Sequence, residues 1–321
     1  MRLFGPTLAS IVFALSAFAS GASAQAQDTN STAVAKAPEF PSAFWQYWGD
    51  GKAELSGYKI SFPRYGELRT GTAVAIFVTE PFSNELRVKA DPGVHSKDDE
   101  FQVLKLNLVQ DFPTGIYDYN LMTSVFVALQ QVNRLPSGSP TKVSFSSQEW
   151  CGHTYSQLLF GTSSLNYTIH SYFDREADQK KSIRSPENLL SEDALFHWAR
   201  GYAFPTLAPG EEITLPIVRS LSYSRLAHAD LTLSTVKLST SDQPVSIQAP
   251  AGNFQARHLK AEIENGPVWE FWVGLDYPHL LYRWKASDGY EGNLLKSTRL
   301  PYWQMNSEKY KSAVKELGLG E

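Results

Sequence analysis

A thiol and an imidazole stand two residues apart in this sequence, at Cys151 and His153. A thiolate activated by an imidazole is a nucleophile, so this pair is the best candidate for covalent catalysis in the chain. On a flat strand the two residues would lie about 6–7 Å apart on one face, too far for a hydrogen bond unless Gly152 permits a bend. A small buried cysteine packed under Trp150 accounts for the same residues, and this structural role is the one we expect.

Other catalytic and metal-binding patterns are missing from the sequence. The seven histidines form no His-x-His, no His-Glu-x-x-His and no pair four residues apart, and there is no Gly-x-Ser-x-Gly. A single cysteine excludes an intramolecular disulfide and a cysteine-only zinc or iron–sulfur site. We read the acidic runs 98–100 and 211–212 as solvated surface. We therefore expect no metal and no cofactor, and a non-enzymatic role is favoured over catalysis.

Aromatic residues are abundant, with 8 Trp, 15 Tyr and 18 Phe making up 13% of the chain. They gather in 44–48, 269–272 and 282–284. Aromatic faces stack on sugar rings or line apolar cavities, and a neighbouring arginine adds cation–π contacts, although such rings also fill the core of a sheet protein. The candidate ligand-binding residues are Trp45, Tyr47, Trp48, Trp269, Trp272, Tyr282 and Trp284.

The charge balance argues against one class of partner. The formal net charge is -4 and the isoelectric point is near 6.0, so the chain has no basic surface for a phosphate backbone. We expect no nucleic-acid partner, and a lipid or glycan ligand or a cell-envelope protein instead.

The N-terminal residues predict export. Arg2 precedes an apolar run from Leu8 to Phe18, and small residues follow at 22–24, which is the pattern of a secretory signal peptide. The run is too short to span a membrane, which takes about 20 apolar residues. We expect a signal peptide at 1–24, a flexible leader at 25–39, no transmembrane segment, and a periplasmic or secreted protein.

Alternation of apolar and polar residues dominates after residue 50 and predicts strands with one face on a core. The turns Asn265-Gly266 and Asp288-Gly289 are strong hairpin signals. Helices are expected at about 185–200 and 307–317. The polar stretch 174–186 is the best linker candidate. The expected strands are 53–62, 72–79, 84–90, 101–109, 116–128, 141–147, 154–160, 165–173, 211–219, 229–238, 244–249, 253–264, 267–275, 280–287 and 291–299.

These elements predict an all-β, mostly antiparallel fold, in which a barrel-like or sandwich sheet curls with one or two short helices. We expect one large β domain over 40–303, or two sheet halves at 40–180 and 187–303, followed by a helix or tail at 304–321.

The segments 44–58, 63–66, 69–72 and 144–153 together resemble a group of uncharacterised exported bacterial proteins, over residues 40–305. Some members of that group are named Maf-type septum-formation inhibitors. The Ser-Pro-Arg-Arg phosphate motif of cytoplasmic Maf pyrophosphatases is missing from this sequence. The stretch 245–298 is similar to a family of periplasmic β proteins of unknown function. Neither resemblance supplies catalytic residues.

The sequence therefore favours a periplasmic, non-enzymatic protein that binds an apolar or glycan component of the cell envelope. A thiol or hydrolytic enzyme that uses Cys151 and His153 is the first alternative. An envelope assembly or scaffold protein, docking along an exposed strand edge, is the second.

Overall fold

The computed structural model describes residues 35–320, so the predicted signal peptide and residues 25–34 of the predicted leader lie outside the described residues. The end of that leader is attached to the fold. Lys36 forms a β-bridge with Thr206, and the side chains of Ala35 and Ala37 pack on the hydrophobic core.

A single 16-stranded sheet makes up most of the described chain. Its strands are β1 (Ala53–Arg64), β2 (Glu67–Ser83), β3 (Glu100–Thr114), β4 (Tyr117–Ala128), β5 (Pro140–Glu149), β6 (Gly152–Phe160), β7 (Ser164–Ser171), β8 (Gln179–Arg184), β9 (Leu190–Ser191), β10 (Glu212–Val218), β11 (Leu233–Thr240), β12 (Val245–Ala249), β13 (Gly252–Ile263), β14 (Val268–Gly274), β15 (Leu281–Ala286) and β16 (Glu291–Leu300). The helical segments are α1 (Ser42–Trp48), η1 (Glu192–Ala194), α2 (Leu195–Ala199), α3 (Leu221–Leu226), η2 (Tyr302–Gln304) and η3 (Glu308–Leu317).

The strand order is β8-β7-β6-β5-β4-β3-β2-β1-β16-β15-β14-β13-β11-β10-β9, with β12 paired to β13. All pairs are antiparallel except β9 with β10. Because β1 pairs with β16, the N-terminal and C-terminal strands form one continuous sheet. These features confirm the predicted all-β, mostly antiparallel class.

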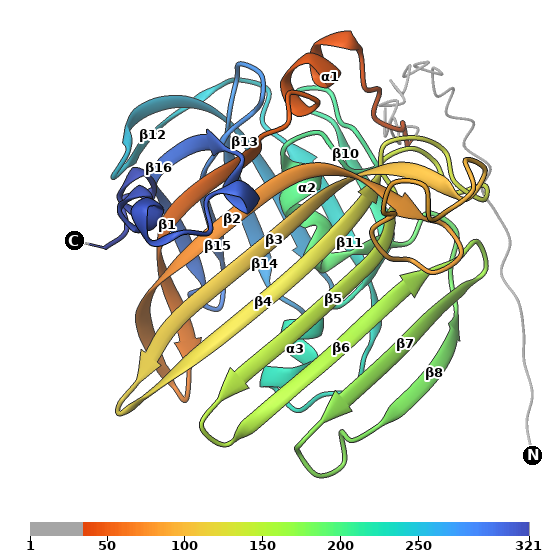
Figure 1. The fold of residues 1–321 in the computed structure, drawn as a ribbon, viewed down its shortest axis with the longest axis horizontal. Coiled ribbons are helices and arrows are strands. Elements are labelled where there is room, and N and C mark those ends of the chain that lie inside the picture. The colour runs from red at the N-terminus through yellow and green to blue at the C-terminus, as the bar shows by residue number, and fades with distance from the viewer. Residues whose placement is uncertain (1–34, 321) are drawn as a thin grey trace, which may run out of the picture. The chain divides into compact units, whose positions relative to one another are not determined.

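The sheet curls until its two edges come near one another, although it does not close. Its first and last strands, β8 and β9, are joined by residues 185–189 alone. Six residue steps span at most about 22 Å, so the facing ends of the two edges cannot lie farther apart than that. In Figure 1, β3 to β8 lie in front, and β10, β11 and β14 lie behind them.

The concave face holds the core. Strands such as β3 and β6 alternate between buried and more exposed residues, as expected when one face packs inward. α2 lies on this face, and all five of its residues are buried, so the helix has no solvent face. Its His197 is fully buried and bonds through Nε2 to the Leu104 carbonyl oxygen at 3.1 Å. Burial lowers the pKa of His197 to about 3, so the imidazole is neutral.

Three predicted elements differ from the structure. The predicted strand 84–90 is instead a turn segment, in which Arg87 has a φ of 55°. Its only β-type pairing is the isolated bridge between Phe82 and Lys89. The predicted linker 174–186 contains β8, whose polar residues suit an edge strand. The predicted helix 185–200 is helical only from Glu192, because Leu190 and Ser191 pair with β10.

The C-terminal tail packs on the sheet. η3 forms where a helix was predicted, as a 3-10 helix, and it ends at Gly318 in the left-handed region with a φ of 71°. A side chain at Gly57 of β1 would collide with the backbone of Leu317, so this glycine permits the close approach of the tail. No helix described in residues 35–320 is long and apolar enough to cross a membrane.

Candidate functional site

A cavity of about 730 Å³ opens into one end of the curled sheet. The antiparallel order brings the β1–β2, β13–β14 and β15–β16 turns to this end, together with the β10–β11 connection that contains α3. We call it the α3 end. All four connections contribute residues to the cavity wall, and η1 and α2 contribute from inside the sheet.

The interior of the cavity is largely apolar. Phe62, Leu106, Leu108, Phe196 and Trp269 line it, and each side chain is at least nine-tenths buried. The mouth carries side chains that are partly exposed, among them Tyr65, Leu68 and Tyr223. A concave, mostly apolar wall with a few placed polar groups is the usual form of a small-molecule site.

A buried ion pair forms one polar part of the wall. Glu192 accepts hydrogen bonds from Arg219 Nε at 2.7 Å and from Trp269 Nε1 at 3.0 Å. The backbone N–H of Ser220 donates a third bond to Glu192, at 2.9 Å. The Arg219 guanidinium also lies over the Tyr223 ring at 4.2 Å. Glu192 therefore has three hydrogen-bond partners, one of which is a cation.

Asp193, the next residue, lacks such a cation. Its carboxylate accepts one bond from Ser220 Oγ at 2.8 Å and one from the Leu221 N–H at 3.1 Å. Within residues 35–320 no lysine, arginine or histidine nitrogen lies within 4.0 Å of it. Burial, with a smaller contribution from the Glu192 charge, raises the pKa of Asp193 to about 7. A cavity-lining carboxyl with a shifted pKa is a candidate functional group.

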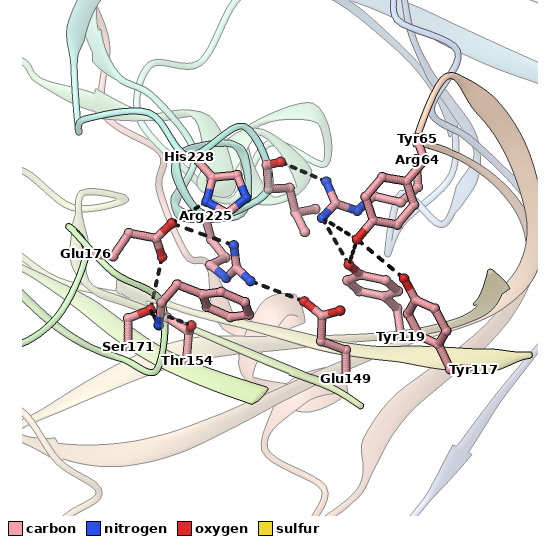
Figure 2. A network of polar contacts seen from close by, with 12 residues as sticks. Arg64, Tyr65, Tyr117, Tyr119, Glu149, Thr154, Ser171, Glu176, Arg225 and His228 are labelled. Carbon is pink, nitrogen blue, oxygen red and sulfur yellow. Dashed lines mark hydrogen bonds and ion pairs between the residues drawn. The ribbon is translucent and has the colours of Figure 1, made fainter. Parts of the chain in front are cut away.

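Polar contacts tie α3 to the far wall of the sheet (Figure 2). Arg225 is buried, lies over the Phe173 ring at 3.6 Å, and donates to Glu149 at 3.2 Å. Glu176 lies 3.7 Å from Arg225 and 2.6 Å from His228. These contacts link α3, which follows β10, to the end of β5 and to the β7–β8 turn.

A second group of contacts in Figure 2 holds α3 beside the cavity mouth. Arg64 donates to the Leu226 carbonyl oxygen at 2.8 Å and to Tyr119 at 2.9 Å. Tyr65 and Tyr119 share a hydrogen bond of 2.7 Å. The position of α3, and with it one wall of the cavity, is therefore fixed by polar contacts on both sides.

The seven predicted aromatic residues do not form one site. Trp269 lines the cavity, and Trp284 is fully buried beside Tyr58 and Phe196. A side chain at Gly292 would collide with the Trp284 ring, so this glycine makes room for it.

Trp272 and Tyr282 do not line the cavity. Trp272 stacks on His258 with ring centroids 4.9 Å apart, and Tyr282 stacks on Phe254 at 4.0 Å. Each ring has an aromatic partner on β13, which neighbours the β14 strand of Trp272 and lies two strands from the β15 strand of Tyr282. These two rings and the cavity are therefore separate places in the fold.

The three predicted ligand-binding residues of α1 lie at the end of the sheet away from α3. Trp48 is buried in the core, and Trp45 is 39% exposed. Tyr47 donates to Glu54 at 3.2 Å and lies 3.8 Å below the Arg299 guanidinium. Glu54 is itself bound through both oxygens to Arg200, at 2.7 and 2.9 Å, in a buried pair.

The predicted burial of Cys151 under Trp150 is wrong. Both residues lie in the β5–β6 turn at the α3 end; Cys151 is exposed, and Trp150 is 74% exposed. The tight turn leaves no core beneath the thiol. Among the described residues no hydrogen bond joins Cys151 to His153, which is also exposed. The geometry of the pair therefore provides no activated thiolate.

Sequence reasoning missed the polar residues of the cavity, Glu192, Asp193, Arg219 and Ser220. One long helix over 185–200 would have left the two acids on a solvated surface. A usable signal was the run 194–199, which is apolar except for His197 and favours a buried helix. Because Glu192 and Asp193 directly precede this buried helix, they are buried as well.

No group of three or more histidine, cysteine, aspartate or glutamate side chains that could hold a metal ion occurs in the described part of the chain. Comparisons with family models, curated proteins and solved structures find no match for this chain. The two resemblances seen in the sequence therefore stay predictions, and the cavity is the basis of the functional proposal.

Proposed function

We propose that this chain is a periplasmic, non-enzymatic binding protein that holds an amphipathic small molecule of the cell envelope inside the curled sheet. The observation that carries the proposal is the cavity of about 730 Å³, which has aliphatic and aromatic walls and a few buried polar groups. Its volume falls within the range of about 300–1,000 Å³ that is usual for small-molecule sites. The export signal expected at residues 1–24 supports the compartment.

The walls favour an apolar body over a glycan. Leu106 and Leu108 present aliphatic side chains, which cannot satisfy the hydroxyl groups of a sugar. Polar side chains occupy other parts of the wall, among them Asp193, Ser220 and Gln110. A ligand that suits both regions has an apolar body and one polar end.

A displacement assay tests the proposal. The neutral fluorescent probe N-phenyl-naphthylamine should brighten on binding the purified protein, and a long-chain alcohol should displace it. Leu108→Trp fills the interior and should weaken probe binding at least about tenfold, since the apolar contact area is lost. Leu86→Trp changes the same residue type at an exposed position outside the cavity and should bind as the wild type does.

A second blocking variant keeps the test valid if Leu108→Trp does not fold. Ser222→Trp narrows the mouth from α3, where Ser222 is only partly buried. If both blocking variants keep the wild-type circular dichroism spectrum and still bind the probe as tightly as the wild type, the cavity is not the binding site. Absence of probe binding to the wild type would also contradict the proposal.

A further inference from the structure

The charges on the cavity wall are unbalanced. Its lining includes two cationic side chains, Arg64 and Arg219, and four carboxyl groups, Glu67, Glu192, Asp193 and Asp288. No lysine or histidine belongs to the lining. The excess of carboxyl groups favours a ligand with a positive charge over one with a negative charge.

Both cationic side chains already have protein partners. Arg219 is bound to Glu192 and stacked on Tyr223, and Arg64 donates to the Leu226 carbonyl oxygen and to Tyr119. Asp193 remains as the buried carboxyl group without a cation. Each of its oxygens accepts one hydrogen bond, whereas an ionised carboxylate has room for about four. The site therefore has acceptor capacity to offer a ligand.

Aromatic rings line the same cavity. Trp269 and Tyr290 pack edge to face with ring centroids 5.7 Å apart, and Phe196 lies 6.2 Å from Trp269. Ring faces attract cations, and a desolvated position strengthens the attraction. A carboxylate together with aromatic rings is a suitable environment for an organic ammonium group.

We propose that the ligand of this cavity is a cationic amphiphile, whose ammonium group pairs with Asp193 while its apolar body lies along Leu106 and Leu108. This inference rests on the proposed function, since it assumes that the cavity is a ligand site. It adds the charge class of the ligand, which the size and apolarity of the cavity do not determine.

The pKa of Asp193 supports the inference. Burial without a cation raises this pKa, and an ammonium ion placed beside the carboxylate would lower it again. Binding near neutral pH should therefore release a proton. The other charged groups of the lining are Glu192 on the same segment, Arg219 before α3, Arg64 and Glu67 at the β1–β2 turn, and Asp288 at the β15–β16 turn.

Three chain-matched compounds test the charge class by titration calorimetry, namely octylammonium, octanol and octanoate. We expect octylammonium to bind at least about tenfold more tightly than octanol, and octanoate to bind more weakly than octanol. In Asp193→Asn the ratio of octylammonium affinity to octanol affinity should fall to about twofold or less, while the affinity for octanol stays unchanged. The asparagine keeps the size of the side chain and one acceptor oxygen.

The wild type alone supplies a second readout, in case the variant does not fold. Octylammonium affinity should rise between pH 6 and pH 8 as Asp193 ionises, and octanol affinity should stay level. His228 directly follows Ala227, which lines the cavity, and is an ionisable side chain close to the site. His228→Asn serves as the control, since asparagine tolerates the φ of 51° at this position, and it should leave the pH dependence in place.

The outcomes separate the two proposals. If octanol or octanoate binds as tightly as octylammonium, the charge class is wrong and the binding function stands. If octylammonium affinity does not change with pH in the wild type, Asp193 is not its partner. If none of the three compounds binds, the proposed function fails and the inference fails with it.

Discussion

Replacement of Asp193 by asparagine should remove the loss of unfolding free energy that this carboxyl causes as the pH rises. The pKa of this carboxyl is raised from 3.8 to about 7 in the folded protein. Below pH 3.8 the group is protonated in both states, and its contribution to stability is fully present. As pH rises from 3.8 to about 7, the unfolded chain loses the proton first, so that contribution is lost.

The magnitude follows from the difference between the two pKa values. Each tenfold change in proton affinity is worth about 1.4 kcal/mol, so the wild type should lose about 4 kcal/mol of unfolding free energy from this group by pH 8. Asparagine carries no charge at any pH. It has one acceptor oxygen for the two donors, Ser220 Oγ and Leu221 N–H, which costs about 1 kcal/mol at every pH. Asp193→Asn should therefore be about 1 kcal/mol less stable at pH 4 and about 3 kcal/mol more stable at pH 8.

Urea unfolding of both proteins over pH 4 to 8 measures this difference. His197 also titrates over part of the range, because its pKa falls from 6.5 to about 3 on folding and acid therefore favours the unfolded chain. Both proteins contain His197, so its effect cancels in the comparison. Glu67→Gln alters an exposed carboxyl at the cavity mouth and should follow the wild type. If the difference between Asp193→Asn and the wild type is the same at pH 4 and pH 8, Asp193 is not the desolvated group described here.

Three other variants or reactions test separate parts of the structure. Arg225→Met should lower the free energy of unfolding by about 3 kcal/mol, because it leaves Glu149 buried without its cation. An unchanged urea unfolding curve would mean that this pair is solvated. Gly292→Ala should cost at least about 2 kcal/mol, since the added methyl group meets the Trp284 ring, and an unchanged melting temperature would contradict the packing. Cys151 should react with iodoacetamide as fast in the native protein as in urea; protection in the native protein would mean that the thiol is covered.

The strands were predictable because their signal is local. The alternation in 53–62 and 253–264, and the hairpin turns at Asn265-Gly266 and Asp288-Gly289, depend only on neighbouring residues, and the structure places strands and turns there. The pairing of β1 with β16 has no local signal, since the two strands are far apart in sequence. The curvature of the sheet follows from that pairing and from the short connection between its edges.

The cavity was less predictable than the strands. Its polar residues come from η1, the start of α3, three turns and the strands β3 and β4, which meet only after the sheet has curled. Counting aromatic residues identified Trp269 but could not tell an inward ring from an outward one across the whole sheet. One-residue alternation on β14 places Trp269 inside the sheet and Trp272 outside it. Glu192 has a cationic partner and Asp193 does not, because only Glu192 contacts Arg219. This contact depends on the tertiary structure and has no signal in the local sequence.

The short connection at 185–189 limits how the curled sheet can change shape. It joins the edges at the end of the sheet opposite α3, because β8 runs away from the α3 end and β9 runs back toward it. No covalent link that short holds the edges together at the α3 end, where the Arg225 contacts with Glu149 and Glu176 span the space instead. The connection therefore limits the separation of β8 and β9 at its own end more tightly than on the side where the cavity opens.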